Sequence, residues 1–174
     1  MAKLSQEVLS VPPEYAGLVV SKPAALLPVL SAESIRNCTE LVMNHMGLQK
    51  LANFERFTNL KILYIGSNRL TDVTGLDKCF RMEKLSCPDN RIRSLEGSLG
   101  NFKFLRTLLL ANNSLSGLDT VSSHLRRLGF LQELELSGNP VSQEVGYRSR
   151  IIAAVPSLVI LDRKRITQQE RSTA

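Results

Sequence analysis

The chain has 174 residues, of which 43% are hydrophobic and 22% charged, with a formal net charge of +6. This size suits one domain around one core and leaves no room for a second domain. There is no run of about 18 or more apolar residues, and the first residues lack a basic start followed by an apolar stretch, so we expect neither a membrane span nor a secretory signal but a cytoplasmic protein.

The first thirty residues are expected to form an extended arm, because Pro12, Pro13, Pro23 and Pro28 preclude a long helix. The same segment, residues 1–30, is too apolar for a freely solvated tail. Two alternatives are open: the arm lies along its own domain, or it docks on a partner. The next residues, 31–37, can form a helical turn capped by Ser31 that covers the open apolar edge at the start of the domain.

A short pattern of apolar residues then recurs five times. Its clearest copy is LRTLLLANNSL, with Leu at 105, 108, 110 and 115 and Asn at 113. The copies begin at residues 38, 60, 82, 105 and 131, which are 22, 22, 23 and 26 residues apart. The first copy has Met46 where the others have Asn. This spacing is the signature of a leucine-rich-repeat solenoid.

In each copy the period-two residues predict a short strand, and strands of successive copies should pair in parallel. We therefore expect an α/β fold: a right-handed solenoid with a curved parallel sheet on the concave face and short helices or 3₁₀ turns on the convex face. The Asn amide should bond backbone groups where the chain turns away from the strand. The predicted domain spans residues 31–166 with caps at both ends, and residues 167–174 form a short tail.

The fourth repeat is long enough for a true helix after Leu118. Asp119 or Thr120 is the expected cap, and Val121, Leu125 and Leu128 share one face.

A second helix is expected to start at Ser142 and to end before Pro156. Its predicted buried side is Val145, Ile151, Ile152 and Val155. A last strand at 158–161 and a capping box at 167–170 complete the predicted elements.

The closing region carries a family resemblance. The matching residues are Asn139, Pro140, Tyr147, Arg148, Ile151, Ile152, Pro156, Leu158, Leu161, Asp162, Ile166, Thr167, Glu170 and Arg171. This run resembles the closing motif of intracellular leucine-rich-repeat proteins, a group that includes a type-one phosphatase regulator, a spliceosomal A-prime protein and small axonemal proteins. The long fourth repeat and short chain look most similar to the small ciliary members, with the spliceosomal A-prime protein as a more distant relative.

The residues argue against catalysis. The two histidines, His45 and His124, lie on different repeats, no glycine-rich phosphate loop is present, and the three cysteines form no CxxC pair. Glu133 and Glu135 are expected on a solvent-open strand face. We predict a protein that is not an enzyme and that has no cofactor and no metal.

The predicted binding surface is the concave sheet. Its outward residues are Val42, Tyr64, Ser86, Leu109 and Glu135, with Ile62 beside Tyr64. An apolar stripe of this kind marks a protein contact. Two other interpretations stay open: scattered apolar residues are normal on surfaces, or the arm covers these residues.

The resemblance favours a structural or assembly subunit of the ciliary or flagellar axoneme, with axonemal or microtubule-associated protein partners. The alternatives are a ribonucleoprotein scaffold, which would be nuclear, and a phosphatase or signalling adaptor. The basic excess suits either an acidic partner or a solvated face. With aromatics at only 5%, residues that could stack on bases are scarce, so a nucleic acid partner is not expected.

Overall fold

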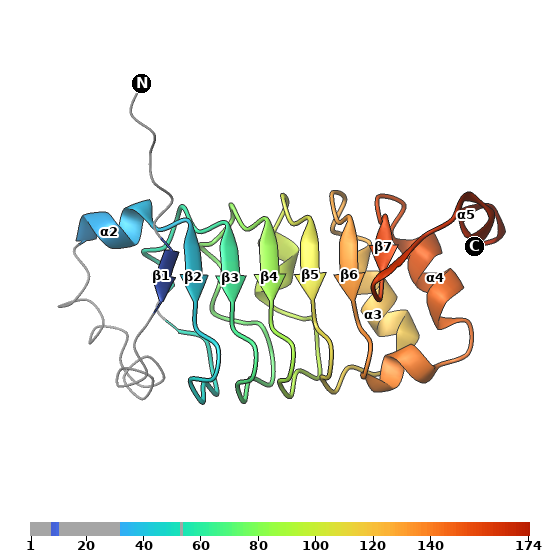
Figure 1. Cartoon of the computed structure of the whole chain (residues 1–174), viewed down its shortest axis with the longest axis horizontal. Helices are drawn as coiled ribbons and strands as arrows, with labels where there is room; N and C mark the ends of the chain where they lie inside the picture. Colours follow the sequence, from blue (N-terminus) through green and yellow to red (C-terminus); the bar gives the residue numbers. More distant parts are fainter. Residues whose placement is uncertain (1–7, 11–31, 53) are drawn as a thin grey trace, which may run out of the picture.

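The computed structural model describes residues 8–10, 32–52 and 54–174 and shows a solenoid with one continuous sheet (Figure 1). Across these residues eight strands follow each other in chain order. Strands β1 to β7 are parallel and β8 pairs antiparallel with β7. The strands are β1 Val8–Ser10, β2 Glu40–Val42, β3 Ile62–Tyr64, β4 Lys84–Ser86, β5 Thr107–Leu109, β6 Glu133–Glu135, β7 Ile160–Leu161 and β8 Lys164–Arg165. The predicted leucine-rich-repeat solenoid is confirmed.

The middle residue of each repeat strand points into the core. These residues are in register from strand to strand and are at most 2% exposed: Leu41, Leu63, Leu85, Leu108 and Leu134, followed by Leu161 of β7. Their flanking neighbours point to the other face, as alternation along a strand requires. The repeat register predicted from the leucine spacing is therefore confirmed in all five copies.

Four asparagines join successive coils through their side chains. Asn113 is representative: its Oδ1 accepts from the backbone N–H of Ile92 at 2.9 Å, while its Nδ2 donates to the carbonyls of Cys87 and Leu110, both at 3.0 Å. The equivalent residues make the same kinds of bond, and we call the set the asparagine ladder: Asn68, Asn90, Asn113 and Asn139. The predicted role of this amide at the turn is confirmed.

Short helices cover the ends and the convex side. The helices are α2 Ala32–Asn37, α3 Leu118–Leu125, α4 Tyr147–Ala154 and α5 Gln168–Thr173, with 3₁₀ turns η3 Ser98–Asn101 and η4 Pro140–Gln143. Helix α2 lies at one end of the sheet, while α4 and α5 lie at the other (Figure 1). The helical turn expected at 31–37 is present from residue 32, and its expected cap, Ser31, lies outside the described residues.

Helix α3 is capped differently from the prediction. Gly117 is its N-cap and makes no side-chain cap bond, so the expected cap at Asp119 or Thr120 is wrong. The carboxylate of Glu144, one coil further on, accepts instead from the backbone N–H groups of Gly117 at 2.8 Å and Leu118 at 3.0 Å. A negative charge there also suits the positive end of the helix dipole. Val121, Leu125 and Leu128 are buried as predicted.

The closing region also departs from the prediction. The single helix expected from Ser142 is instead the turn η4, then Gly146 at a left-handed φ of 74°, then α4. Because the break falls at Gly146, Val145 lies outside α4 and is 97% exposed, so its predicted burial is wrong. Strand β7 is shorter than expected, and β8 was not predicted.

The expected arm contributes one strand to the sheet. The backbone of β1 pairs with β2, placing Val8 opposite Glu40, Leu9 opposite Leu41 and Ser10 opposite Val42. This pairing accords with the alternative in which the arm lies along its own solenoid. The rest of the predicted arm, 1–7 and 11–30, lies outside the described residues.

Candidate protein-binding surface

The predicted site residues lie together on two neighbouring rows of the concave sheet. One row runs across the strands in register as Val42, Tyr64, Ser86, Leu109 and Glu135. The other row contains Ile62, with Lys84 on the next strand and Thr107 and Glu133 further along. We call these two rows the concave face.

The apolar part of the concave face is centred on Tyr64. Val42, Ile62 and Tyr64 are half-buried, which leaves part of each side chain open to a partner. The Nζ of Lys84 lies 5.1 Å from the centre of the Tyr64 ring, a cation–π contact that holds the ring in place. Leu109 lies two strands further on, roughly 10 Å away at a spacing of about 4.8 Å per strand. The small, buried Ser86 lies between them.

Glu135 does not belong to the open surface. Its side chain is only 10% exposed, and its Oε1 lies 2.7 Å from Nε of Arg163. Ser137 Oγ donates to the same oxygen at 3.1 Å. The prediction that this carboxylate faces solvent is therefore wrong, because the turn between β7 and β8 places Arg163 over it. Glu133 is half-buried and accepts from Thr107 Oγ1 at 3.4 Å.

The residues that carry the family resemblance form a closing network. Tyr147 Oη donates to Asp162 Oδ2 at 2.8 Å, and Asp162 Oδ1 accepts from the backbone N–H of Leu136 at 2.7 Å. Arg148 joins Glu170 through Nε and Oε1 at 2.6 Å and also donates to the carbonyl of Leu161 at 3.1 Å. These side chains tie α4, β7 and α5 together. Their role in the structure is to close the end of the solenoid.

The closing network shifts the titration of two of its members. Burial, with the neighbouring Asp162 carboxylate, raises the pKa of the Tyr147 hydroxyl. The hydrogen bond from Arg148 lowers the pKa of Glu170 to about 2. Helix α5 also begins with the predicted capping box, in which Thr167 Oγ1 accepts from the backbone N–H of Glu170 at 3.2 Å. Glu170 therefore serves both the cap of α5 and the ion pair to α4.

We expect Glu170→Gln to weaken the attachment of α5 in a pH-dependent way. The folded-state pKa of Glu170, about 2, lies below its ordinary value of 4.5, so its contribution to stability is present above pH 4.5 and is lost as the pH falls toward 2. The melting temperatures of wild type and variant should differ at neutral pH and converge near pH 2. A difference that stays constant over this range would contradict the assignment.

Reactive groups are scattered or buried in the part of the chain that the structure describes. Burial raises the pKa of the Cys79 and Cys87 thiols to about 12, which leaves them protonated at neutral pH. Three or more His, Cys, Asp or Glu side chains do not come together anywhere among residues 8–10, 32–52 and 54–174 in a way that could hold a metal ion. Over the same residues no helix has the length and hydrophobicity to cross a membrane.

Residues 63–174 match the family described as Leucine-rich repeat. The chain is 31% identical over 120 residues to leucine-rich repeat-containing protein 51 of Bos taurus, a match that covers 64% of this chain and 62% of that protein. It is 34% identical over 113 residues to U2 small nuclear ribonucleoprotein A' of Candida glabrata, covering 65% of this chain and 42% of that protein. In both cases the match spans less than two thirds of the relative.

The fold is also that of one chain in a solved complex. The crystal structure of the Drosophila melanogaster SNF/U2A' complex contains a chain that superposes with a TM-score of 0.70, covering 95% of this chain and 90% of that one. The sequence identity is 21%, so this likeness concerns the fold.

Proposed function

Because the chain belongs to the leucine-rich-repeat family, we propose that it is a non-catalytic scaffold subunit that holds a protein partner on its concave face. The observation that supports this is the half-buried apolar row of Val42, Tyr64 and Leu109, with Ile62 beside it. Aromatic residues dominate interface hot spots, so Tyr64 is the proposed anchor. Its contact with Lys84 fixes the ring before binding, which lowers the ordering cost.

The partner that fits this face is a helix or an extended segment laid across the strands. Such a segment would cross three strands from Tyr64 to Leu109 and would meet only the small side chain of Ser86 between them. Lys84 and Glu133 on the neighbouring row carry opposite charges, which would orient the segment more than hold it.

The parent assembly has two candidates. The first is the ciliary or flagellar axoneme, which rests on the long fourth repeat and its resemblance to small axonemal members; the protein would then be cytoplasmic. The second is a ribonucleoprotein, favoured by the relative named U2 small nuclear ribonucleoprotein A'. In that case the protein would be nuclear and its partner would be a ribonucleoprotein subunit.

We expect the double change Tyr64→Ala with Leu109→Ser to abolish partner binding without unfolding the solenoid. Both side chains are partly exposed, so their truncation costs binding energy more than stability. Proteins that co-purify with the tagged wild type should be absent with this variant. The matched control is Val145→Ser, which removes an apolar side chain that is 97% exposed and lies between η4 and α4, outside both rows of the concave face.

The same purification separates the two assemblies. Recovery of axonemal proteins that survives nuclease treatment supports the first candidate, and recovery of ribonucleoprotein subunits together with RNA supports the second. If the double variant keeps all its partners while circular dichroism shows a native fold, the concave face is not the binding surface.

A further inference from the structure

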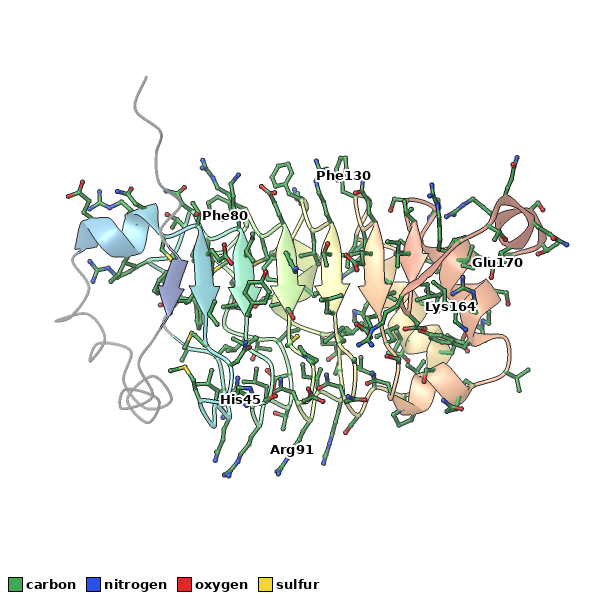
Figure 2. All side chains as sticks on the ribbon, viewed as in Figure 1. His45, Phe80, Arg91, Phe130, Lys164 and Glu170 are labelled. Atoms are coloured by element: carbon green, nitrogen blue, oxygen red, sulfur yellow. The ribbon has the colours of Figure 1, made fainter. Side chains whose placement is uncertain are left out.

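A second surface lies at the edge of the solenoid where the chain enters the strands. It is a cleft of about 480 Å³ lined by Lys61, Arg81, Glu83, Phe104, Arg106 and Phe130. We call it the entry-edge cleft. Phe130 lies at the upper edge in Figure 2, away from the middle of the sheet. None of its six residues belongs to the predicted concave face.

The two phenylalanines are exposed at equivalent places in neighbouring coils. Phe104 and Phe130 each precede their strand by three residues, since Thr107 pairs with Glu133. Phe104 is 56% exposed and Phe130 is 59% exposed. The equivalent positions in the preceding and following coils are Arg81 and Ser157, so the apolar row consists of these two rings. Two large rings exposed side by side in one cleft are more than isolated surface residues would give.

The charged residues of the cleft are mostly basic and partly unpaired. Lys61 Nζ lies 3.0 Å from Glu83 Oε1, so these two charges satisfy each other. The guanidinium groups of Arg81 and Arg106 make no ion pair with any other described residue. The cleft therefore combines two exposed phenyl rings with two arginines free to bind carboxylates.

We propose that the entry-edge cleft binds an acidic segment of a protein partner that also carries apolar side chains. Apolar side chains of the segment pack on Phe104 and Phe130, while its carboxylates pair with Arg81 and Arg106. The two unpaired arginines favour an acidic ligand through charge complementarity, and the two exposed rings favour a ligand that also carries apolar groups.

The surroundings favour a protein segment over single-stranded nucleic acid. A nucleic acid groove needs basic residues along the backbone path and aromatic faces for the bases. Here the carboxylate of Glu83 lines the cleft and already pairs with Lys61, so the basic groups do not form a continuous path for a phosphate backbone. Another group of basic residues lines a separate cleft, with Lys50, Arg69 and Arg91, and no aromatic residue lines it. Arg91 lies at the opposite edge from Phe130 in Figure 2.

This site extends the proposed function, because the entry-edge cleft and the concave face are distinct surfaces. A scaffold with both could hold two segments at once, either from one partner or from two. The concave-face variant Tyr64→Ala with Leu109→Ser should therefore leave the entry-edge cleft intact. The two proposals can fail separately.

The test is direct binding measured by fluorescence anisotropy with three labelled probes and the whole chain. The probes are a random copolymer of glutamate and tyrosine, polyglutamate of equal length, and oligouridine. We expect the glutamate–tyrosine copolymer to bind most tightly. Phe104→Ser with Phe130→Ser should weaken its binding about tenfold or more, and Arg81→Ser with Arg106→Ser should do the same and reduce its salt dependence.

Matched controls remove the same kinds of exposed side chain outside the entry-edge cleft. Val145→Ser removes an exposed apolar side chain, and Arg91→Ser with Arg93→Ser removes two exposed arginines from the opposite edge. Both controls should bind the copolymer like wild type, and unchanged melting temperatures should show that every variant is folded. Equal binding of polyglutamate and copolymer, or equal loss in the controls, would overturn the proposal. The absence of copolymer binding would also overturn it. If oligouridine binds and the Phe104 and Phe130 changes abolish that binding, the cleft is a nucleic acid site and the proposal is wrong.

Discussion

Leu108→Asp should leave the chain unfolded. Leu108 is the central residue of β5, has no exposed surface, and lies in register between Leu85 and Leu134. A carboxylate at this position has no partner and no water, which costs several kcal/mol or more, and a domain of this size has only about 5–15 kcal/mol in total. Circular dichroism at 25 °C should show loss of the native spectrum and no cooperative melt.

The control for this change is Tyr64→Asp, which introduces the same group on the concave side of β3, two strands away. Tyr64 is partly exposed, and the ammonium group of Lys84 lies over its ring. The variant should fold and melt cooperatively. A native melt in Leu108→Asp would mean that the strand register is wrong, since the two positions differ chiefly in which face of the sheet they occupy.

Asn113→Ala should lower the free energy of unfolding strongly, although less than Leu108→Asp. The change leaves the backbone N–H of Ile92 without its side-chain acceptor inside the solenoid. It also removes one of two side-chain donors from the carbonyls of Cys87 and Leu110, which keep their bonds from Asn90 and Asn139. A buried N–H left unpaired costs about 1–3 kcal/mol and each lost hydrogen bond about 1 kcal/mol, so we expect a total loss of roughly 3 kcal/mol. That loss lowers the melting temperature by roughly 10 °C.

The matched control is Asn101→Ala, which removes an exposed amide that bonds only Asp77 at 3.2 Å. Its effect should stay within about 0.5 kcal/mol, as is usual for surface positions. Urea titrations of the two variants give the comparison. Equal losses would show that the asparagine ladder contributes no more than a surface hydrogen bond.

The repeats could be predicted from the sequence because their signal is local. A strand of three residues with one buried leucine, followed by Asn at a fixed distance, recurs at each coil, so every copy supports the interpretation of the others. The register, the buried leucines and the asparagine ladder all result from this recurrence. The helix in the fourth repeat could be predicted as well, because its apolar residues have helical spacing and the repeat is longer than the rest.

Two of the errors concern contacts between coils that no local pattern indicates. The backbone N–H groups at the start of α3 are bonded by Glu144, which lies 26 residues beyond Leu118 in the chain. The sequence predicts a solvent-exposed Glu135, but Arg163 lies over it in the structure. Arg163 is held there by the turn into β8, a strand of only two residues that has no clear sequence signal. Val145 has the spacing of a buried helical residue, but Gly146 interrupts the helix.

The entry-edge cleft was missed for a different reason. The positions between the strand leucines form the concave face, whereas Phe104 and Phe130 lie before their strands. A signal was present, since both occur at the same distance before the strand in successive repeats. The aromatic content of the whole chain, 5%, is also uninformative here, because it does not show that several exposed phenylalanines lie on neighbouring coils.

Strand β8 has a consequence for self-association. A solenoid built from parallel coils presents an open strand at its last coil, and such an edge can template the first strand of another copy. Here β8 turns back and pairs with β7 in the opposite direction, so that side of β7 is no longer open to a parallel strand. The two residues of β8, Lys164 and Arg165, are exposed and positively charged. Charged residues on a short edge strand oppose pairing with a neighbour, so β8 acts against end-to-end polymerisation of the solenoid into fibres.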